Sequence, residues 1–270
     1  MTQVVKVCDT AEVAAQLDSA GFVCLENAVA PDWIDRARAH VEMLAERHTG
    51  RYFALNWPSR EEGSPWHEIT NDPALKRLLT GLVKHGCRKA KVEDEIYNVL
   101  RVVTGASGDS KSLNYHYDNT VITALAPVLI PEGPERNAGE LLVYANRRPY
   151  RSSVLTNIAE KAVVQSDWYR KRITDALPDG AIDEIKLLKP GNLYLFWGYR
   201  SYHGNFPVKH DLLRATFLMH LGDPHGGNLA LDAIKRLNLR RERRNRERAA
   251  RAAPALARAA CDYDRASATN

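Results

Sequence analysis

Side chains that suit a metal ion occur in two separated stretches of the sequence. Residues 114–119, NYHYDN, contain His116 and Asp118. On a β-strand, residues two positions apart point to the same face, roughly 6.6–6.8 Å apart along the chain, so both could reach one ion. A lone His-x-Asp pair is weak support, because nine histidines in 270 residues produce such pairs by chance.

A later stretch strengthens the metal hypothesis. Residues 194–217, YLFWGYRSYHGNFPVKHDLLRATF, contain His203, then Arg214 eleven positions later, then Thr216 on the same strand face as Arg214. The eleven-residue interval also occurs at two other histidines. At His203 alone, a hydroxyl residue follows the arginine by two positions. The interval that starts at His203 is also the only one that both lies between two strand-like runs and follows the sole His-x-Asp.

This combination of side chains indicates a specific chemistry. Two imidazoles and one carboxylate on one face of a metal leave three positions open, as non-haem Fe(II) oxygenases require. Both ligand types bind the metal in unprotonated form. The Arg214 guanidinium offers a planar, permanently charged fork for a carboxylate, and Thr216 adds a hydroxyl donor. The pair would anchor a dicarboxylic acid whose other end chelates the metal.

The ordered set resembles the Fe(II)/2-oxoglutarate-dependent dioxygenase superfamily. The opening GFVCLENAVAPDWID, residues 21–35, resembles the N-terminal strand and helix of its phytanoyl-CoA dioxygenase-like branch. The resemblance covers roughly residues 10–225. It implies a mainly β fold with flanking helices, namely a double-stranded β-helix, the jelly-roll, cupin-like barrel.

The resemblance also implies roles for the five residues. His116, Asp118 and His203 would bind Fe(II), and Arg214 and Thr216 would hold the distal carboxylate of 2-oxoglutarate. In this superfamily 2-oxoglutarate and O₂ are consumed, succinate and CO₂ are released, and a substrate is hydroxylated. Related halogenases carry a small residue in place of the carboxylate, so the aspartate argues against halogenation.

The expected substrate is a small soluble metabolite, such as an amino acid or a natural-product intermediate. Nucleic-acid repair members of the superfamily carry a second arginine six positions after the first, where this chain has His220. Hydroxylation, desaturation and cyclisation remain open. Residues near the ligand strands that could line the substrate pocket are Asn98, Arg101, Asn114, Trp197 and Arg200.

Two other functions stay open at this point. One is a barrel protein with a vestigial metal site whose basic tail binds RNA or DNA. The other is a cupin-like metalloenzyme that does not use 2-oxoglutarate. Loss of salt-dependent nucleic-acid retention on deletion of residues 235–270 would favour the first.

Hydrophobic periodicity and helix signals divide the chain into a helical and a sheet-forming part. Capping and stop residues predict helices over 9–21, 31–50 and 72–86, so that the first ninety residues are mainly helical. From about Val92, short β-branched and aromatic runs predict an antiparallel sandwich or barrel. These runs are 94–103, 119–130, 139–145, 184–189, 192–198 and 213–221. Residues 152–178 have a more helical composition, and we expect them to form an insertion over the barrel mouth.

Composition limits the remaining possibilities. A chain of 270 residues with 44% hydrophobic and 26% charged residues can bury one substantial core. The longest mostly apolar stretch, residues 121–131, is far shorter than the roughly 20 residues that a membrane span needs. Four scattered cysteines form no C-x-x-C pair, so a disulfide framework is not indicated. We expect a cytoplasmic protein.

The positive charge is concentrated near the C-terminus. Residues 235–258 hold ten basic and two acidic residues, whereas residues 1–234 hold 27 basic and 29 acidic ones, a net charge of −2. The sequence therefore predicts one oxygenase domain over 1–228 and a basic, helical or partly disordered tail over 229–270. The tail lacks aromatic residues interleaved with its arginines, which favours a solvated helix over nucleic-acid binding. The expected partner is a small molecule, not a membrane or a nucleic acid, and a homo-oligomer is compatible with the sequence.

Overall fold

The computed structural model describes the greater part of the chain up to residue 226. The described residues are 3–6, 8–48, 52–104, 114–132, 137–150, 160, 163–164, 166, 168–169, 172, 185–209 and 212–226. The chain divides into two compact units, Met1–Gly226 and Gly227–Asn270. The predicted tail, 229–270, lies outside the described residues.

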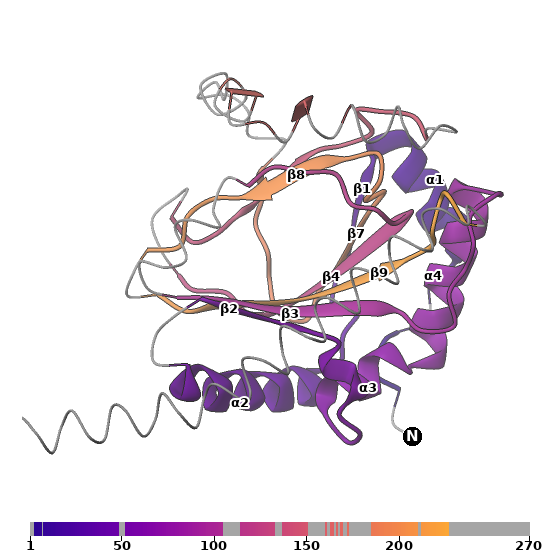
Figure 1. Ribbon diagram of the computed structural model, residues 1–270. Helices are drawn as coiled ribbons and strands as arrows, with labels where there is room; N and C mark the ends of the chain where they lie inside the picture. The colour runs from indigo at the N-terminus through magenta and orange to yellow at the C-terminus, as the bar shows by residue number, and fades with distance from the viewer. Residues whose placement is uncertain are drawn as a thin grey trace, which may run out of the picture. The chain divides into compact units, whose positions relative to one another are not determined.

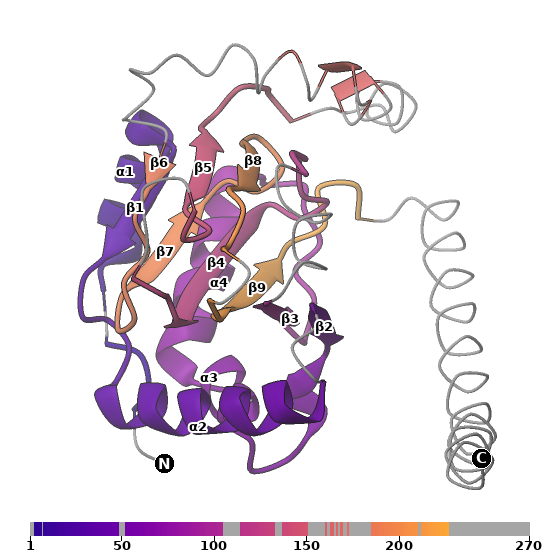
Figure 2. The same cartoon turned by 90° about the vertical axis from the view of Figure 1, so that its left-hand side faces the viewer.

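Two antiparallel sheets form the centre of the first unit (Figures 1 and 2). The larger sheet has the strand order β1-β7-β4-β9-β3-β2, and the smaller one the order β6-β5-β8. The strands are β1 Phe22–Leu25, β2 Phe53–Asn56, β3 Tyr97–Val103, β4 Ile122–Leu129, β5 Leu141–Tyr144, β6 Ile185–Lys186, β7 Leu193–Phe196, β8 Tyr202–Asn205 and β9 Arg214–Leu221. The described strands thus form the two facing sheets of a jelly roll, as predicted, without closing into a barrel.

The three predicted helices form where their capping residues indicate. Helix α1, Thr10–Ala20, begins after Asp9, whose side chain accepts a hydrogen bond from the Ala11 amide, and it ends at Gly21. Gly21 has a φ of 71°, which only glycine adopts readily. Helix α2, Pro31–Arg47, has proline at its first position, where the missing amide proton is not needed.

Helix α4, Pro73–Gly86, is capped by Asp72, which accepts hydrogen bonds from the amides of Ala74 and Leu75. The first ninety residues also contain elements that the sequence patterns did not predict. These are β2, the 3-10 turn η1 Pro58–Arg60 and the helix α3 Pro65–Thr70. They are short, so that periodicity has too few residues to identify them.

The helices pack on the outer face of the larger sheet. Trp33 of α2 meets Trp66 of α3 edge-on at 5.9 Å between ring centroids, and Trp66 lies 5.0 Å from Phe217 of β9. The Trp33 indole N–H donates to the carbonyl of Pro65 at 2.7 Å, which satisfies a buried donor. Leu79 and Leu82 of α4 are fully buried in the same core. This packing supports the larger sheet from behind and leaves its other face to the second sheet.

A second cluster fills part of the space between the sheets. Leu125 of β4 and Phe196 of β7 pack there with Leu141 and Val143 of β5. Since successive strand residues face opposite sides, β4 and β7 contribute side chains both to this cluster and to the core between the larger sheet and the helices. The space between the sheets is called the interior below.

Most of the segment 152–178 lies outside the described residues. Of its described members, Val164 and Tyr169 pack against Tyr202 of β8, and the Tyr202 hydroxyl donates to the Val164 carbonyl at 2.6 Å. Tyr202 precedes His203 and so faces the opposite side of its strand. These residues therefore cover the outer face of the smaller sheet. The predicted insertion over the barrel mouth lies mostly outside the described residues and stays a prediction.

Over the described part of the chain, we find no helix that combines the length and the apolar character needed to cross a membrane.

Candidate metal centre

A single backbone bridge brings the two candidate histidines together. The amide of His116 donates to the carbonyl of His203 at 2.9 Å, and the amide of His203 donates back at 3.0 Å. Residues paired in this way share a face, and the two imidazole centroids lie 4.5 Å apart. The segment around His116 was expected to be a strand, but it forms this isolated bridge only.

Asp118 completes the cluster. Its Oδ1 lies 3.5 Å from Nε2 of His116 and 3.6 Å from Nε2 of His203. Within the described residues, these three form the only group of three or more histidine, cysteine and acidic side chains whose donor atoms could share an ion, all within 4.8 Å. Ligand bonds of about 2.0–2.2 Å place adjacent donors about 3 Å apart, so modest shifts suffice.

Backbone carbonyls fix the orientation of both imidazoles. Nδ1 of His116 donates to the carbonyl of Asn114 at 2.9 Å, and Nδ1 of His203 donates to the carbonyl of Ser201 at 3.1 Å. Because the proton is held on Nδ1, the lone pair is on Nε2, which faces Asp118 in both residues. Metal-binding histidines use this arrangement, with the second nitrogen donating to a carbonyl or carboxylate.

The protonation states suit a divalent cation. Burial lowers the pKa of His203 to about 4, so this imidazole is neutral at pH 7. Burial alone would raise the pKa of the Asp118 carboxyl, but the surrounding imidazoles of His203, His220 and His116 hold it well below its ordinary value. A neutral imidazole and an ionised carboxylate are the forms that bind a metal.

The second oxygen of Asp118 is held by residues that the sequence analysis did not assign to the site. The Thr123 hydroxyl donates to Oδ2 at 2.5 Å, and His220 Nδ1 donates to the Thr123 oxygen at 3.0 Å. A Cβ on Gly198 would lie 2.4 Å from the Thr123 hydroxyl and 2.7 Å from Oδ2, so only glycine fits there. Asp118 thus has Oδ1 toward the imidazoles and Oδ2 engaged by protein.

The opposite side of this segment is supported by a buried arginine. The Arg148 guanidinium stacks between the rings of Tyr117 and Tyr199, 4.0 and 4.1 Å from their centroids. Tyr117 lies between His116 and Asp118 and points away from them. The stacked arginine therefore holds the short segment that carries two of the three ligands.

Arg214 and Thr216 lie on β9, on the same face as His220. Arg214 is 1% exposed, and burial, followed by the like charge of Arg101, lowers its pKa to about 9. The guanidinium stays protonated at pH 7. A Cβ on Gly139 would lie 2.4 Å from Cδ of Arg214, so this glycine lets the smaller sheet approach the arginine closely.

The Arg214 guanidinium has unused hydrogen-bonding capacity. Its Nε and Nη2 are buried without an acceptor among the described residues. A buried unpaired donor is destabilising, which makes such atoms rare in folded proteins. A carboxylate accepting from both atoms would satisfy them, so the residues present fit the distal end of a dicarboxylic acid.

Of the five residues considered for substrate contact, the structure turns one toward the interior. Arg101 is paired with Thr216 across β3 and β9 and therefore shares its face. Asn98 is fully buried, and its amide donates to Ser59 Oγ and to the Ile96 carbonyl. Asn114 contributes its carbonyl to His116.

Trp197 and Arg200 lie on the helical side. The Trp197 indole N–H donates to Asp18 of α1 at 3.2 Å, and Nη1 of Arg200 lies 3.8 Å from the same carboxylate oxygen. Both residues were suggested because they are close to His203 in sequence. The segment between β7 and β8 instead directs them to the side of the larger sheet on which the helices pack. A substrate role is therefore unsupported for both, as it is for Asn98, whereas the role of the exposed Asn114 stays a prediction.

The structure separates the histidines of the segment after β9. His220 lies beside Asp118, whereas the His225 amide donates to the Asp223 side chain in a turn. Within the described residues, these histidines and Asp223 therefore form no second metal site. The alternation of Arg214, Thr216, Leu218 and His220 along one strand face could have placed His220 in the site.

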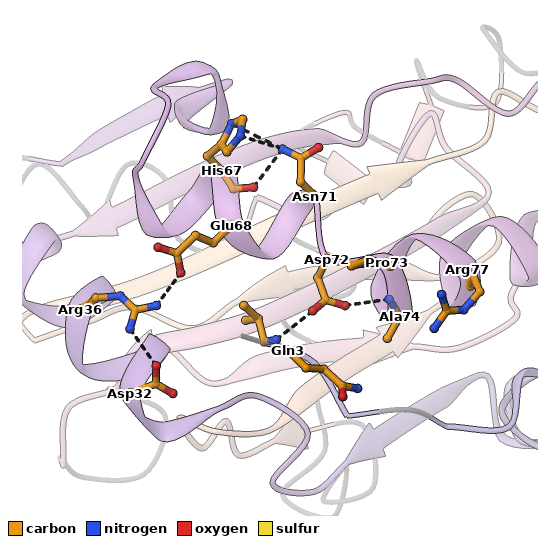
Figure 3. Close-up of a pocket in the computed structure, with 11 residues that line it drawn as sticks. Gln3, Asp32, Arg36, His67, Glu68, Asn71, Asp72, Pro73, Ala74 and Arg77 are labelled. Atoms are coloured by element: carbon orange, nitrogen blue, oxygen red, sulfur yellow. Dashed lines mark hydrogen bonds and ion pairs between the residues drawn. The ribbon is translucent and has the colours of Figure 1, made fainter. Parts of the chain in front are cut away.

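A separate cavity of about 640 Å³ lies among α2, α3 and the start of α4 (Figure 3). Four of its five charged side chains are already engaged by described residues, Arg77 being the exception, and Arg36 pairs with both Asp32 and Glu68. Asp72 accepts from the amides of Val4, Val5, Ala74 and Leu75. None of the metal-centre residues lines this cavity. We therefore regard its polar residues as structural.

The sequence matches no known protein-family signature and no curated protein sequence. Solved structures share its fold. A prolyl-4-hydroxylase from Pseudomonas putida is 10% identical, with a TM-score of 0.50, over 82% of this chain and 98% of that one. AviO1 from Streptomyces viridochromogenes Tue57 is 16% identical, with a TM-score of 0.51, over 81% and 97%.

A third similar structure is the non-heme alpha-ketoglutarate-dependent epimerase SnoN from nogalamycin biosynthesis. It is 13% identical, with a TM-score of 0.52, over 79% of this chain and 80% of that one. Alpha-ketoglutarate is another name for 2-oxoglutarate. The chain therefore shares the fold of these solved structures, which include a prolyl-4-hydroxylase and a non-heme alpha-ketoglutarate-dependent epimerase.

Proposed function

We propose that the protein is an Fe(II)- and 2-oxoglutarate-dependent oxygenase that hydroxylates a small-molecule metabolite and releases succinate and CO₂. The observation that carries this proposal is that a triad able to bind a metal and a buried arginine, whose Nε and Nη2 lack acceptors among the described residues, share the interior between the two sheets. Neither feature alone defines the class. Together they match the two ends of 2-oxoglutarate, a metal chelator at one end and a free carboxylate at the other.

Each side chain has a defined task in this proposal. His116, His203 and Asp118 would hold Fe(II), which supplies the redox chemistry with O₂ when bound. Arg214 and Thr216 would orient 2-oxoglutarate by its distal carboxylate, so that the keto-acid end faces the metal. Thr123 keeps Oδ2 of Asp118 engaged and leaves Oδ1 for the metal. A triad of protein ligands leaves open positions for the co-substrate and O₂.

The direct test is succinate formation by purified protein with Fe(II), 2-oxoglutarate and O₂. We expect Asp118→Ala to lower the rate by more than about 100-fold, beyond the 10–100-fold typical of losing an outer-shell partner, because a metal ligand is removed. Asp35→Ala on the exposed face of α2 is the matched control and should keep the parental rate. Equal succinate formation by Asp118→Ala and the parent would refute the proposal.

Direct measurement of substrate oxidation separates the cupin-like alternative, which would form no succinate. If substrate oxidation requires the metal but proceeds unchanged in Arg214→Ala, the enzyme does not depend on this arginine for 2-oxoglutarate. We expect instead that this variant raises the Michaelis constant for 2-oxoglutarate. A bidentate charge-assisted contact accounts for a loss of about tenfold or more, at 1.5–3 kcal/mol per hydrogen bond to a charged group.

A further inference from the structure

Arg101 is a second cation in the interior. It lies on β3 opposite Thr216, at a position where cross-strand neighbours have Cβ atoms about 4.5–5.5 Å apart. Thr216 is two residues from Arg214 on the same face. The sheet therefore places a second guanidinium one strand away from the one that would hold 2-oxoglutarate.

The strand register places Arg101 between the two ends of the site. Its cross-strand partner Thr216 is two residues from Arg214 and four residues from His220 along the same face of β9. After burial, the like charge of Arg101 contributes to the lowered pKa of Arg214. It thus stands between the arginine end and the metal end of the interior.

No described residue neutralises this charge. Arg101 forms no ion pair with any described carboxylate, and its Nε is buried without an acceptor in the same part of the chain. The carboxylates of the interior are engaged elsewhere, because Asp118 faces the imidazoles and Glu140 acts on Arg214. Arg101 is half-buried, and its buried Nε lacks an acceptor among the described residues, a donor that a bound anion would satisfy.

2-Oxoglutarate would leave this cation free. One of its two carboxylates would chelate the metal with the keto group, and the other would occupy Arg214 and Thr216. Among the described residues no carboxylate is then left for this guanidinium, and a negative group of the substrate would supply one. A planar, permanently charged fork fits a carboxylate in bidentate geometry.

We propose that Arg101 binds a carboxylate of the substrate, so that the enzyme acts on a small carboxylic acid such as an amino acid. This inference rests on the proposed function and specifies its substrate class. Arg101 would anchor the acid beside the metal centre and so determine which carbon is presented to it. Neutral analogues would lose this anchor.

Turnover measurements test the substrate class. The probes are L-proline, L-leucine, L-lysine, L-glutamine, hexanoate and benzoate, each beside its carboxamide. We expect at least one acid to stimulate succinate formation, and its carboxamide to do so at least about 100-fold less efficiently, consistent with loss of two charge-assisted hydrogen bonds. Arg101→Gln should lose the response to that acid by a similar factor, and Arg101→Lys should recover only part of it.

Two comparisons identify which molecule Arg101 holds. The Michaelis constant for 2-oxoglutarate should rise in Arg214→Gln. In Arg101→Gln it should change by less than about twofold, which is less than the change expected from losing one hydrogen bond to a charged group. Arg77→Gln, an exposed arginine of α4, is the matched control for the substitution itself. A rise in the 2-oxoglutarate constant in Arg101→Gln equal to that in Arg214→Gln would overturn the inference.

A crystal structure with Mn(II), 2-oxoglutarate and acetate, grown without O₂, covers the case in which no probe acid is turned over. We expect an acetate carboxylate on the Arg101 guanidinium. If Arg101→Gln crystals hold acetate in the same place, the acetate is an adventitious additive only, and this would count against the proposal. An empty Arg101 site, or 2-oxoglutarate occupying it, would also overturn it. Absence of any succinate formation by the parent would instead refute the proposed function itself.

Discussion

The two oxygens of Asp118 have different surroundings, and this difference determines which oxygen is available to a metal in the candidate metal centre. Oδ1 faces the Nε2 atoms of both histidines, whereas Oδ2 accepts the hydroxyl proton of Thr123. A carboxylate with one oxygen engaged by protein is favoured to bind a metal through the other. Thr123 is therefore a positioning residue that acts through Asp118.

Thr123→Val tests this positioning role. The substitution keeps the branched shape of the side chain but removes the hydroxyl donor, so that Oδ2 loses its hydrogen bond. We expect Fe(II) affinity to fall by about 10–100-fold, as is typical for loss of such a partner of a metal ligand. The measurement is anaerobic metal titration.

Thr123→Ser provides the control because it restores the hydroxyl. It should bind Fe(II) nearly as well as the parent, although valine and serine both change the packing at this position. If the valine variant binds the metal with the parental affinity, Oδ2 does not need Thr123 and the assigned role is wrong.

At the scale of elements, the short bridge between His116 and His203 is the least predictable part of the site. Alternation on a strand correctly predicted that His116 and Asp118 can act together, but the segment forms no regular strand. The turn at Gly198 and the bridge set its path, and no local sequence pattern indicates either. Thr123 was missed for the same reason, since its contact with Asp118 depends on where that segment lies.

The longer elements could be predicted from local signals. Helices α1 and α4 follow the capping residues Asp9 and Asp72, and α2 begins at Pro31. The side-chain chemistry of these residues marks a helix start. Strands β3, β4 and β9 combine β-branched residues with a length of seven or eight residues. Strand β8, which carries His203, has the sequence YHGN and was not predicted, because it lacks β-branched residues.

Helix α4 stabilises the site only through the sheet that it supports. Leu79 is fully buried against the larger sheet, so Leu79→Ala should lower the free energy of unfolding by about 2–5 kcal/mol, as core leucine truncations do. Urea unfolding measures this. Leu187→Ala is the control, because Leu187 is 68% exposed and its truncation should change stability by less than about 0.5 kcal/mol. Equal effects of the two substitutions would contradict the packing described for α4.

At the scale of the whole molecule, the sequence predicted the jelly roll through an ordered set of five residues. That order agrees with the observed topology, in which the bridge between His116 and His203 and the strands β8 and β9 bring the five residues to one interior. The sequence could not distinguish inward-facing from outward-facing neighbours of the ligands. Arg101 and Arg200 were equal candidates, and only the register of β3 and the turn after β7 separate them.

The unpaired arginine in the interior gives a prediction about the stability of the entire domain. Without a ligand, burial disfavours the charged form of Arg214, and its Nε and Nη2 have no described acceptor. Arg214→Met replaces this cation with an apolar chain of similar length. We expect the free energy of unfolding of the ligand-free protein to rise by about 1–4 kcal/mol, the range seen when buried charged groups are replaced by apolar ones.

The same substitution should abolish stabilisation by the co-substrate. For the parent with Mn(II) and no O₂, 2-oxoglutarate at 100 times its dissociation constant should add about 2.7 kcal/mol to the free energy of unfolding, because it binds only the folded state. Arg214→Met should gain almost nothing at that concentration. Arg77→Met, at an exposed position on α4, should behave as the parent in both experiments. If Arg214→Met destabilises the ligand-free protein instead, Glu140 is already a sufficient partner for Arg214, and the arginine does not wait for a carboxylate.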